Sequence, residues 1–249
     1  MKNKALKAVL AVFILLIFLI IGGYLTDNRI SLPIKSYWNM REVKTATYQI
    51  DLKSALNQWE VEIGGRLLSD YEKDRSLFKL DGSDRLLPRE IQVLRIEDSF
   101  YTQRLFFSDE WILLDQKEQE EIRPLFQWEK WMENRSWKDL GYLFALTRED
   151  DKASMILRDE GYFEGEELNR WFNEMIAGGT RVGETDFIEI KDYQVEYHFN
   201  KEEDLPEKMI LTAWFEPLQE ELALTVSIEL QAINEPFIKI PEGLQIKGR

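Results

Sequence analysis

The chain contains one histidine, His198, in a stretch where apolar and polar residues alternate from Val195 to Phe199. A catalytic histidine needs a nucleophile within reach, and a zinc-binding histidine needs further ligands nearby. The sequence has no G-x-S-x-G elbow, no H-E-x-x-H pattern and no P-loop. We therefore interpret His198 as an ordinary strand residue, and we predict no catalytic residue, no metal site and no cofactor.

Acidic residues are the other candidates for chemistry, because paired carboxylates act as acid and base in glycan cleavage and carboxylate oxygens bind calcium. They gather in three runs, at 118–121, 149–151 and 164–167. None of these runs has the spacing of a calcium-binding loop, and 31% of the chain is charged. We interpret them as solvated surface, with a carboxylate-based cell-envelope hydrolase left as an alternative function.

Aromatic and methionine side chains gather in the middle of the chain, at Trp128, Trp131, Met132, Trp137 and Phe144. Such side chains bury large areas and adapt to irregular shapes. Core packing explains the cluster, and a groove that receives an apolar molecule is the alternative. We take these five residues as candidates for lining a ligand cavity.

Composition excludes several classes of function. The formal net charge is −14, so the surface repels phosphates and nucleic acid is excluded as a partner. The absence of cysteine excludes disulfides, thiol nucleophiles and thiolate metal sites. With 44% hydrophobic and 12% aromatic residues, the chain can bury a core, and no linker-like stretch divides it.

Residues 6–25 form a nearly unbroken apolar run, with Lys2 and Lys4 before it and Lys7 at its start. About twenty such residues span a bilayer, and basic flanks stay in the cytoplasm. The pattern predicts a cytoplasmic N-terminus and transmembrane anchor at 1–25, a juxtamembrane connector at 26–35 and an extracytoplasmic domain at 36–249. A cleaved signal peptide is the alternative for this run.

Hydrophobic spacing predicts the elements that would position these residues. Spacings of three and four predict helices at 36–56 and within 117–176, including 164–176. Alternation predicts strands at 59–63, 76–80, 91–96, 100–107, 111–114, 195–199, 209–215 and 222–230. Gly64-Gly65 is interpreted as a bend or bulge. The expected fold class is α+β, a curved antiparallel sheet covered by helices.

The C-terminal third resembles the end of bacterial lipoprotein-carrier domains of the LolA/LppX type. The residues that carry the resemblance are Tyr193–Phe199, Asn200-Lys201, Leu205-Pro206, Leu222–Leu230 and the closing stretch Asn234–Glu242, and Phe107–Ile112 resembles a strand of the family's first half. The resemblance implies a half-open antiparallel barrel whose concave face is closed by helices and holds a lipid or another apolar group.

The predicted function is that of a non-catalytic, membrane-anchored protein of the bacterial cell envelope that binds a lipid or another apolar ligand. A membrane protein is a possible partner. The alternative among non-enzymes is a structural accessory subunit of an envelope membrane complex.

Overall fold

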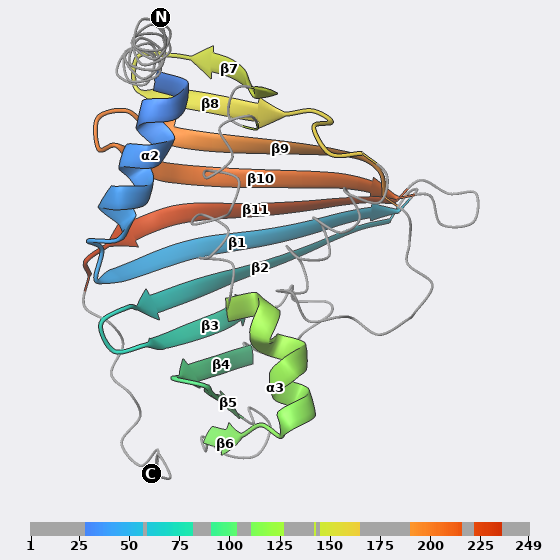
Figure 1. Cartoon of the computed structure of the whole chain (residues 1–249). Coiled ribbons are helices and arrows are strands. Elements are labelled where there is room, and N and C mark those ends of the chain that lie inside the picture. Colours follow the sequence, from blue (N-terminus) through green and yellow to red (C-terminus); the bar gives the residue numbers. More distant parts are fainter. Residues whose placement is uncertain are drawn as a thin grey trace, which may run out of the picture.

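The computed structural model describes residues 28–56, 59–81, 91–103, 111–126, 142, 145–164, 190–215 and 222–235. These residues form one large antiparallel sheet with helices lying over one of its faces (Figure 1). The elements are α2 (Asn28–Met40), β1 (Thr45–Leu56), β2 (Trp59–Asp70), β3 (Arg75–Asp81), β4 (Ile91–Ile96), β5 (Ser99–Gln103), β6 (Trp111–Leu113), α3 (Gln116–Ile122), the 3₁₀ turn η1 (Arg123–Phe126), β7 (Thr147–Asp150), β8 (Ser154–Asp159), β9 (Ile190–Asn200), β10 (Leu205–Phe215) and β11 (Leu222–Ile233).

The sheet has 11 strands in the order β6-β5-β4-β3-β2-β1-β11-β10-β9-β8-β7. Strands β1 to β6 follow one another as one meander, and β7 to β11 form a second. The two meanders join where β1 pairs with β11, with Ile50 opposite Ile228 and Ala46 opposite Ile233. This pairing contains one register shift, between Thr47 and Tyr48.

Alternation along the central strands gives the sheet one apolar face. In β9, the side chains of Tyr193, Val195, Tyr197 and Phe199 are buried, and the residues between them are partly exposed. Pairing continues the pattern sideways, because buried neighbours on β8, β10, β11 and β1 fall in register with these residues. The buried residues of this face form the main core of the described chain.

The opposite face of the sheet is mostly polar and is held by contacts between neighbouring strands. Thr212 Oγ1 lies 3.2 Å from Thr225 Oγ1, across β10 and β11. On the same two strands, Lys208 Nζ lies 3.4 Å from Glu229 Oε2. A small second core lies on this face near β6, formed by Leu77, Leu94, Ile96 and Tyr101.

Both described helices pack on the apolar face. Helix α2 contacts β9 and β10, and η1 contacts β3 (Figure 1). Helix α3 begins with a capping box in which Glu118 N–H donates to Asp115 Oδ1 at 2.8 Å and Asp115 N–H donates to Glu118 Oε2 at 2.9 Å. The turn that follows places Phe126 against Phe78 and Phe100, with ring centroids 6.3 and 5.3 Å apart.

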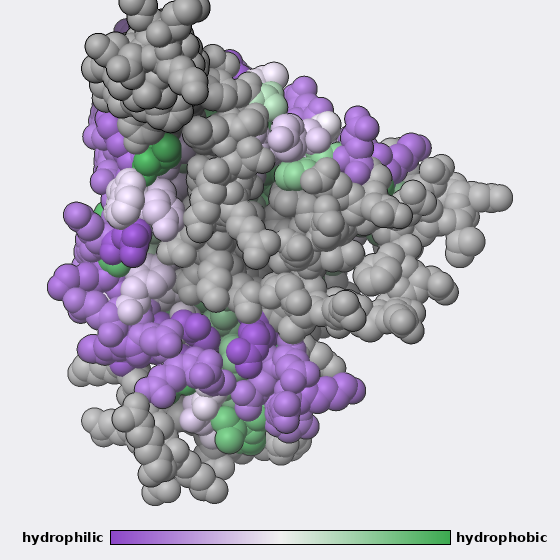
Figure 2. Space-filling model, viewed as in Figure 1, coloured by the Kyte–Doolittle hydropathy of each residue, from purple (hydrophilic) through white to green (hydrophobic). Residues whose placement is uncertain are grey.

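On the side of the molecule where these helices lie, most of the described surface is hydrophilic, with small hydrophobic areas (Figure 2). Helix α2 shows why: its inward residues Leu32, Pro33 and Ser36 are buried, whereas Lys35 and Asn39 are exposed. The helix is therefore amphipathic, with one stripe on the sheet and the other in water.

The predicted fold class, a helix-covered α+β domain with a transmembrane helix, is wrong. The described part is mostly one antiparallel sheet, and the α-helices whose bounds it contains are Asn28–Met40 and Gln116–Ile122. Residues 45–56, predicted as helix, form β1, where Ala46, Tyr48 and Ile50 are buried at every second position. These apolar residues fit both periods, and pairing with β2 and β11 on either side selects the strand.

The prediction of helices within 117–176 is corrected in part. Residues 147–150 and 154–159 form the strands β7 and β8, whereas α3, Tyr142 and Ala145 are helical. The predicted helix at 164–176 lies outside the described residues, apart from residue 164. Gly64-Gly65 carries no register shift, since Gly64 pairs with Asp51 and Gly65 with Ile50 in an unbroken ladder.

The predicted membrane anchor at residues 6–25 lies outside the described residues. In the part of the chain that the structure describes, no helix is long and apolar enough to cross a bilayer. On this finding we withdraw the prediction of a single-pass membrane protein with a cytoplasmic N-terminus. Helix α2 also runs across the predicted boundary between the connector at 26–35 and the domain that was expected to begin at residue 36.

Gly65 is a point of close approach between β2 and β3. A Cβ atom added there would lie 3.0 Å from both the Lys79 carbonyl oxygen and Phe78 Cζ. A Cβ added at the neighbouring Gly64 would meet only side-chain atoms, the nearest being Asp51 Oδ1 at 3.2 Å. The backbone oxygen cannot move aside as a flexible side chain can, so a side chain at Gly65 should be tolerated less well than one at Gly64.

We expect Gly65→Ala to lower the free energy of unfolding by about 1–3 kcal/mol, because overpacking strains the β2–β3 ladder. Gly64→Ala is the matched control and should cost clearly less. Urea denaturation followed by circular dichroism measures both variants. Equal losses for the two variants would show that the close approach at Gly65 has no energetic effect.

Candidate functional site

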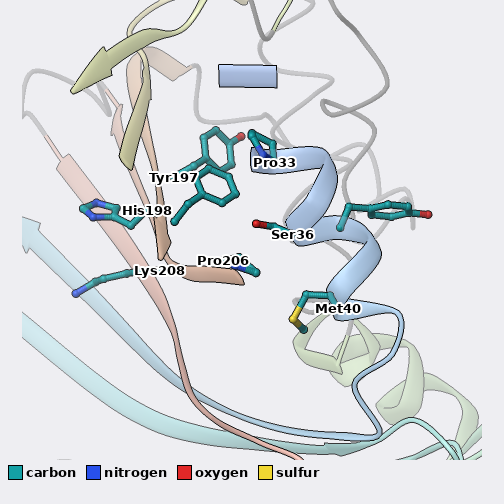
Figure 3. Close-up of a pocket in the computed structure, with 9 residues that line it drawn as sticks. Pro33, Ser36, Met40, Tyr197, His198, Pro206 and Lys208 are labelled. Carbon is teal, nitrogen blue, oxygen red and sulfur yellow. The ribbon is translucent and has the colours of Figure 1, made fainter. Parts of the chain in front are cut away.

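A small pocket lies between helix α2 and the paired strands β9 and β10. The residues that line it are Pro33, Ser36, Tyr37, Met40, Tyr197, His198, Phe199, Pro206 and Lys208. Those from α2 fall three and four positions apart, so one stripe of the helix forms one wall. The other wall is the end of the apolar sheet face, where Phe199 is buried and Tyr197 points toward α2 (Figure 3).

The pocket is apolar and has room for about one water molecule. The two basic residues that line it direct their charged ends elsewhere: His198 and Lys208 point away from α2 (Figure 3). Each has an acidic partner on the polar face, since His198 Nε2 lies 3.0 Å from Glu196 Oε2 and Lys208 pairs with Glu229. The interior therefore holds no basic group.

Ser36 is the polar residue of α2 that is enclosed in this pocket. Its side chain is 2% exposed, and its hydroxyl points toward Tyr197 and Pro206 (Figure 3). Among the described residues, this hydroxyl has no hydrogen-bond partner. Leaving a buried hydroxyl unpaired costs free energy that a paired or absent hydroxyl does not.

Polar contacts that hold α2 against the sheet lie near its C-terminal half. Asn39 Nδ2 donates to the Asp204 carbonyl oxygen at 3.1 Å, and the Lys35 ammonium lies 3.6 Å from Asp204 Oδ2. Lys35 is largely exposed, and exposed ion pairs contribute about 0–1 kcal/mol. Helix α2 is thus attached more weakly than the strands, which are held by continuous ladders.

A buried network of hydroxyl and carboxyl groups begins at one of the pocket's residues. The hydroxyls of Tyr197 and Tyr142 are 3.1 Å apart. Nearby, Tyr193 Oη donates to Asp159 Oδ2 at 2.9 Å and accepts from the Phe163 backbone N–H at 2.8 Å. The network ties the end of β8 and the turn after it to β9.

Asp159 is the acidic centre of this network and is 2% exposed. Burial raises the pKa of its carboxyl, opposed by hydrogen bonds from the Tyr162 backbone, Tyr193 and Tyr142. Burial likewise raises the pKa of Tyr193 and, well above its usual value, that of Tyr142. The hydroxyls of Tyr193 and Tyr142 therefore stay protonated at neutral pH and serve as hydrogen-bond donors to Asp159.

His198 lies in β9, as predicted for a strand residue, next to an ion-pair cluster on the polar face. Arg158 Nε donates to Glu196 Oε1 at 2.9 Å, and the other carboxylate oxygen faces His198. Partial burial acts to raise the pKa of Glu196, but the hydrogen bonds from Arg158 and His198 outweigh it and the pKa is lowered. This arrangement joins β8 to β9 and stabilises the sheet.

The described residues include no group of three or more histidine, aspartate or glutamate side chains that is placed to hold a metal ion. The predicted cavity residues Trp128, Trp131, Met132, Trp137 and Phe144 all lie outside the described residues. The structure therefore does not test whether they line a cavity.

The sequence interpretation missed the residues that form the described site, although two signals were available. Asp159 falls at the third position of an alternation begun by Met155 and Leu157, so a charged residue stands where the pattern places an apolar one. Ser36 likewise stands in the stripe that includes Pro33 and Met40. A polar residue on an apolar face is the informative exception.

No protein-family model matches the sequence, and no curated protein matches it. Among solved structures, the chain is similar to lipoprotein LppX of Mycobacterium tuberculosis, with 8% identity, 84% of this chain and 97% of that chain covered, and a TM-score of 0.47. It is similar to LprF of Mycobacterium bovis at 9% identity, with 86% and 96% covered and a TM-score of 0.42. It is also similar to a LolA superfamily protein of Nitrosomonas europaea at 10% identity, with 81% and 93% covered and a TM-score of 0.30.

These similar structures are of the LolA/LppX type that the sequence resemblance named. They match over most of the chain, and the comparisons do not test the special role given to its C-terminal third. At such identities and TM-scores, the likeness says nothing of a ligand or an activity.

Asp159 and the exposed Asp151 should respond to pH in opposite directions. The folded state raises the pKa of Asp159, so its contribution to stability is full below the unfolded-state pKa, about 4, and is lost as pH rises through the folded-state pKa. The pKa of Asp151 is lowered by hydrogen bonds from the Ser154 backbone and hydroxyl, so its contribution is present above about pH 4 and lost as pH falls.

Melting temperatures from pH 3 to pH 7 measure this difference. Wild type should lose stability relative to Asp159→Asn as pH rises, and should gain stability relative to Asp151→Asn. Comparing each variant with wild type at the same pH cancels the titration of all other groups. Slopes of the same sign for both variants would contradict the burial effect at Asp159.

Proposed function

We propose that this domain binds an apolar ligand, such as the acyl part of a lipid, beneath helix α2, and that it does not transform the ligand chemically. The observation that carries the proposal is the pocket between α2 and the β9–β10 pair. Its walls are formed by Pro33, Met40, Tyr197, Phe199 and Pro206, while the two basic residues point away (Figure 3). Apolar walls with few polar groups are typical of sites for small molecules.

The pocket as it stands is too small for an acyl chain, so binding requires α2 to move away from the sheet. The attachment of α2 suits such a movement. Its side-chain contacts with the β9–β10 turn are a hydrogen bond from Asn39 and an exposed ion pair of Lys35. In contrast, β9 and β10 pair with each other from Ile190 to Phe215, and each also pairs with a second strand along part of its length, β9 with β8 and β10 with β11. The helix is the wall that can open, and the sheet is the fixed wall.

The aromatic segment with Trp128, Trp131, Met132, Trp137 and Phe144 remains part of this proposal as further lining for the same ligand. Large aromatic side chains would supply the area that an acyl chain buries. Replacing Trp131 or Phe144 with a charged residue should then weaken binding of a hydrophobic dye more than it lowers stability.

A second candidate function, docking to a protein partner as an accessory subunit, has its own support on the outer side of α2. Trp38 is 57% exposed, and the Arg41 guanidinium lies 5.3 Å from the centre of its ring. Tryptophan and arginine are enriched at the centres of protein interfaces. Loss of partner binding in Trp38→Ala, with dye binding unchanged, would favour this second function.

A disulfide that fixes α2 to the β9–β10 turn tests the proposed binding. Asn39 Nδ2 lies 3.5 Å from the Glu203 carbonyl oxygen, and the chain has no cysteine of its own, so Asn39→Cys combined with Glu203→Cys introduces one pair. The oxidised protein should bind N-phenyl-1-naphthylamine at least about ten-fold more weakly than the reduced protein, because α2 can no longer open.

Fluorescence titration measures the affinity, and mass spectrometry confirms the disulfide. The two single-cysteine variants are the controls, since oxidation should leave their dye binding unchanged. Equal affinity in the oxidised and reduced forms of the double variant would rule out entry beneath α2.

A further inference from the structure

The unpaired hydroxyl of Ser36 points to the chemistry of the ligand. Ser36 is buried in the middle of the inward stripe of α2, where alanine would avoid burying an unpaired hydroxyl. Its Oγ has no hydrogen-bond partner among the described residues, and it faces the pocket (Figure 3). A ligand group that occupies the pocket would meet this hydroxyl first.

Three other polar side chains that line the pocket are engaged elsewhere. The Tyr197 hydroxyl lies 3.1 Å from that of Tyr142, and His198 and Lys208 face acidic partners on the opposite side of the sheet. Ser36 therefore offers the pocket a buried, unpaired hydroxyl, and neither lining cation points into it (Figure 3). Burying a carboxylate or phosphate there would carry the cost of an uncompensated charge, whereas a neutral acceptor would not.

We propose that Ser36 is a ligand-binding residue that donates its hydroxyl proton to the carbonyl oxygen of an uncharged acyl ester, with the acyl chain lying against the apolar sheet face. This inference rests on the proposed binding of an apolar ligand beneath α2 and specifies the ligand class. An ester carbonyl can accept the hydrogen bond that Ser36 offers and carries no charge, which matches a pocket into which no cation points. A net hydrogen bond of ordinary strength corresponds to about a five-fold change in affinity.

Displacement of N-phenyl-1-naphthylamine from the full chain tests the inference with three ligands of equal chain length: methyl decanoate, decanoate and decane. Each ligand is compared with itself in wild type and in Ser36→Ala, so that differences in solubility cancel. Both proteins contain residues 1–27, so dye bound to that apolar segment is the same in both.

We expect Ser36→Ala to weaken methyl decanoate binding about five-fold and to leave decane and decanoate binding unchanged. An unchanged affinity for methyl decanoate would overturn the role of Ser36, and so would an equal loss for decanoate, since the site would then not select an uncharged group. An unchanged affinity for methyl decanoate is also the result expected if the Ser36 hydroxyl binds only a water molecule. If none of the three ligands displaces dye from wild type, the proposed function itself fails.

Ser69→Ala is the matched control. Ser69 is also a buried serine on the apolar face, but its hydroxyl is 3.3 Å from that of Ser76. Its removal should lower the melting temperature and leave methyl decanoate binding unchanged. Ser36→Ala should melt no lower than wild type, because it removes an unpaired hydroxyl. Ser36→Cys keeps the size of the side chain with a weaker donor and should give a smaller loss of ester affinity, which provides a second test if the alanine variant misfolds.

Discussion

The structure depends on keeping one face of a very wide sheet away from water. The central strands of the eleven-stranded antiparallel sheet alternate apolar and polar residues in register, so the apolar positions of both meanders add up to a single surface. Adding further strands to the sheet enlarges this apolar face and does not cover it, so other parts of the chain must pack against it. The inward stripe of α2, the aromatic contacts of Phe126 and the tyrosine network around Asp159 all lie on this face, because it is the place where the chain gains most by packing.

Two polar groups on the apolar face illustrate two different uses of a buried polar side chain. Asp159 is surrounded by donors, namely the Tyr193 hydroxyl and the backbone N–H of Tyr162, and its role is to fix the turn that follows β8. Ser36 faces a pocket and lacks such donors and acceptors. A buried polar group whose hydrogen bonds are all made stabilises the fold, whereas a buried polar group without a partner beside a pocket is available to a ligand. The same distinction separates His198, which is engaged with Glu196, from a catalytic histidine.

The strands of the last third were predictable from the sequence because alternation is unambiguous there: Leu222, Leu224, Val226 and Ile228 stand at every second position. Residues 45–56 were assigned to a helix because their apolar residues fit spacings of two and of four, and only pairing with distant strands decides between them. Strand β7 has no apolar pattern at all, since all four of its residues are exposed. The site was hidden for a similar reason, because the contact between Ser36 and the neighbourhood of Tyr197 joins segments some 160 positions apart in the chain.

The pairing of β1 with β11, the seam between the two meanders, has a consequence for how the protein folds. Each meander is built from hairpins between sequence neighbours, which close quickly. The seam, in contrast, pairs Ala46 with Ile233 and therefore closes a loop of nearly the whole described chain. During synthesis from the N-terminus, β1 lacks its second partner until β11, the last described strand along the chain, has emerged. Until that moment the first meander presents an unpaired edge and an incomplete apolar face, so the nascent chain is most vulnerable to aggregation late in its production and gains its cooperative stability in one last step.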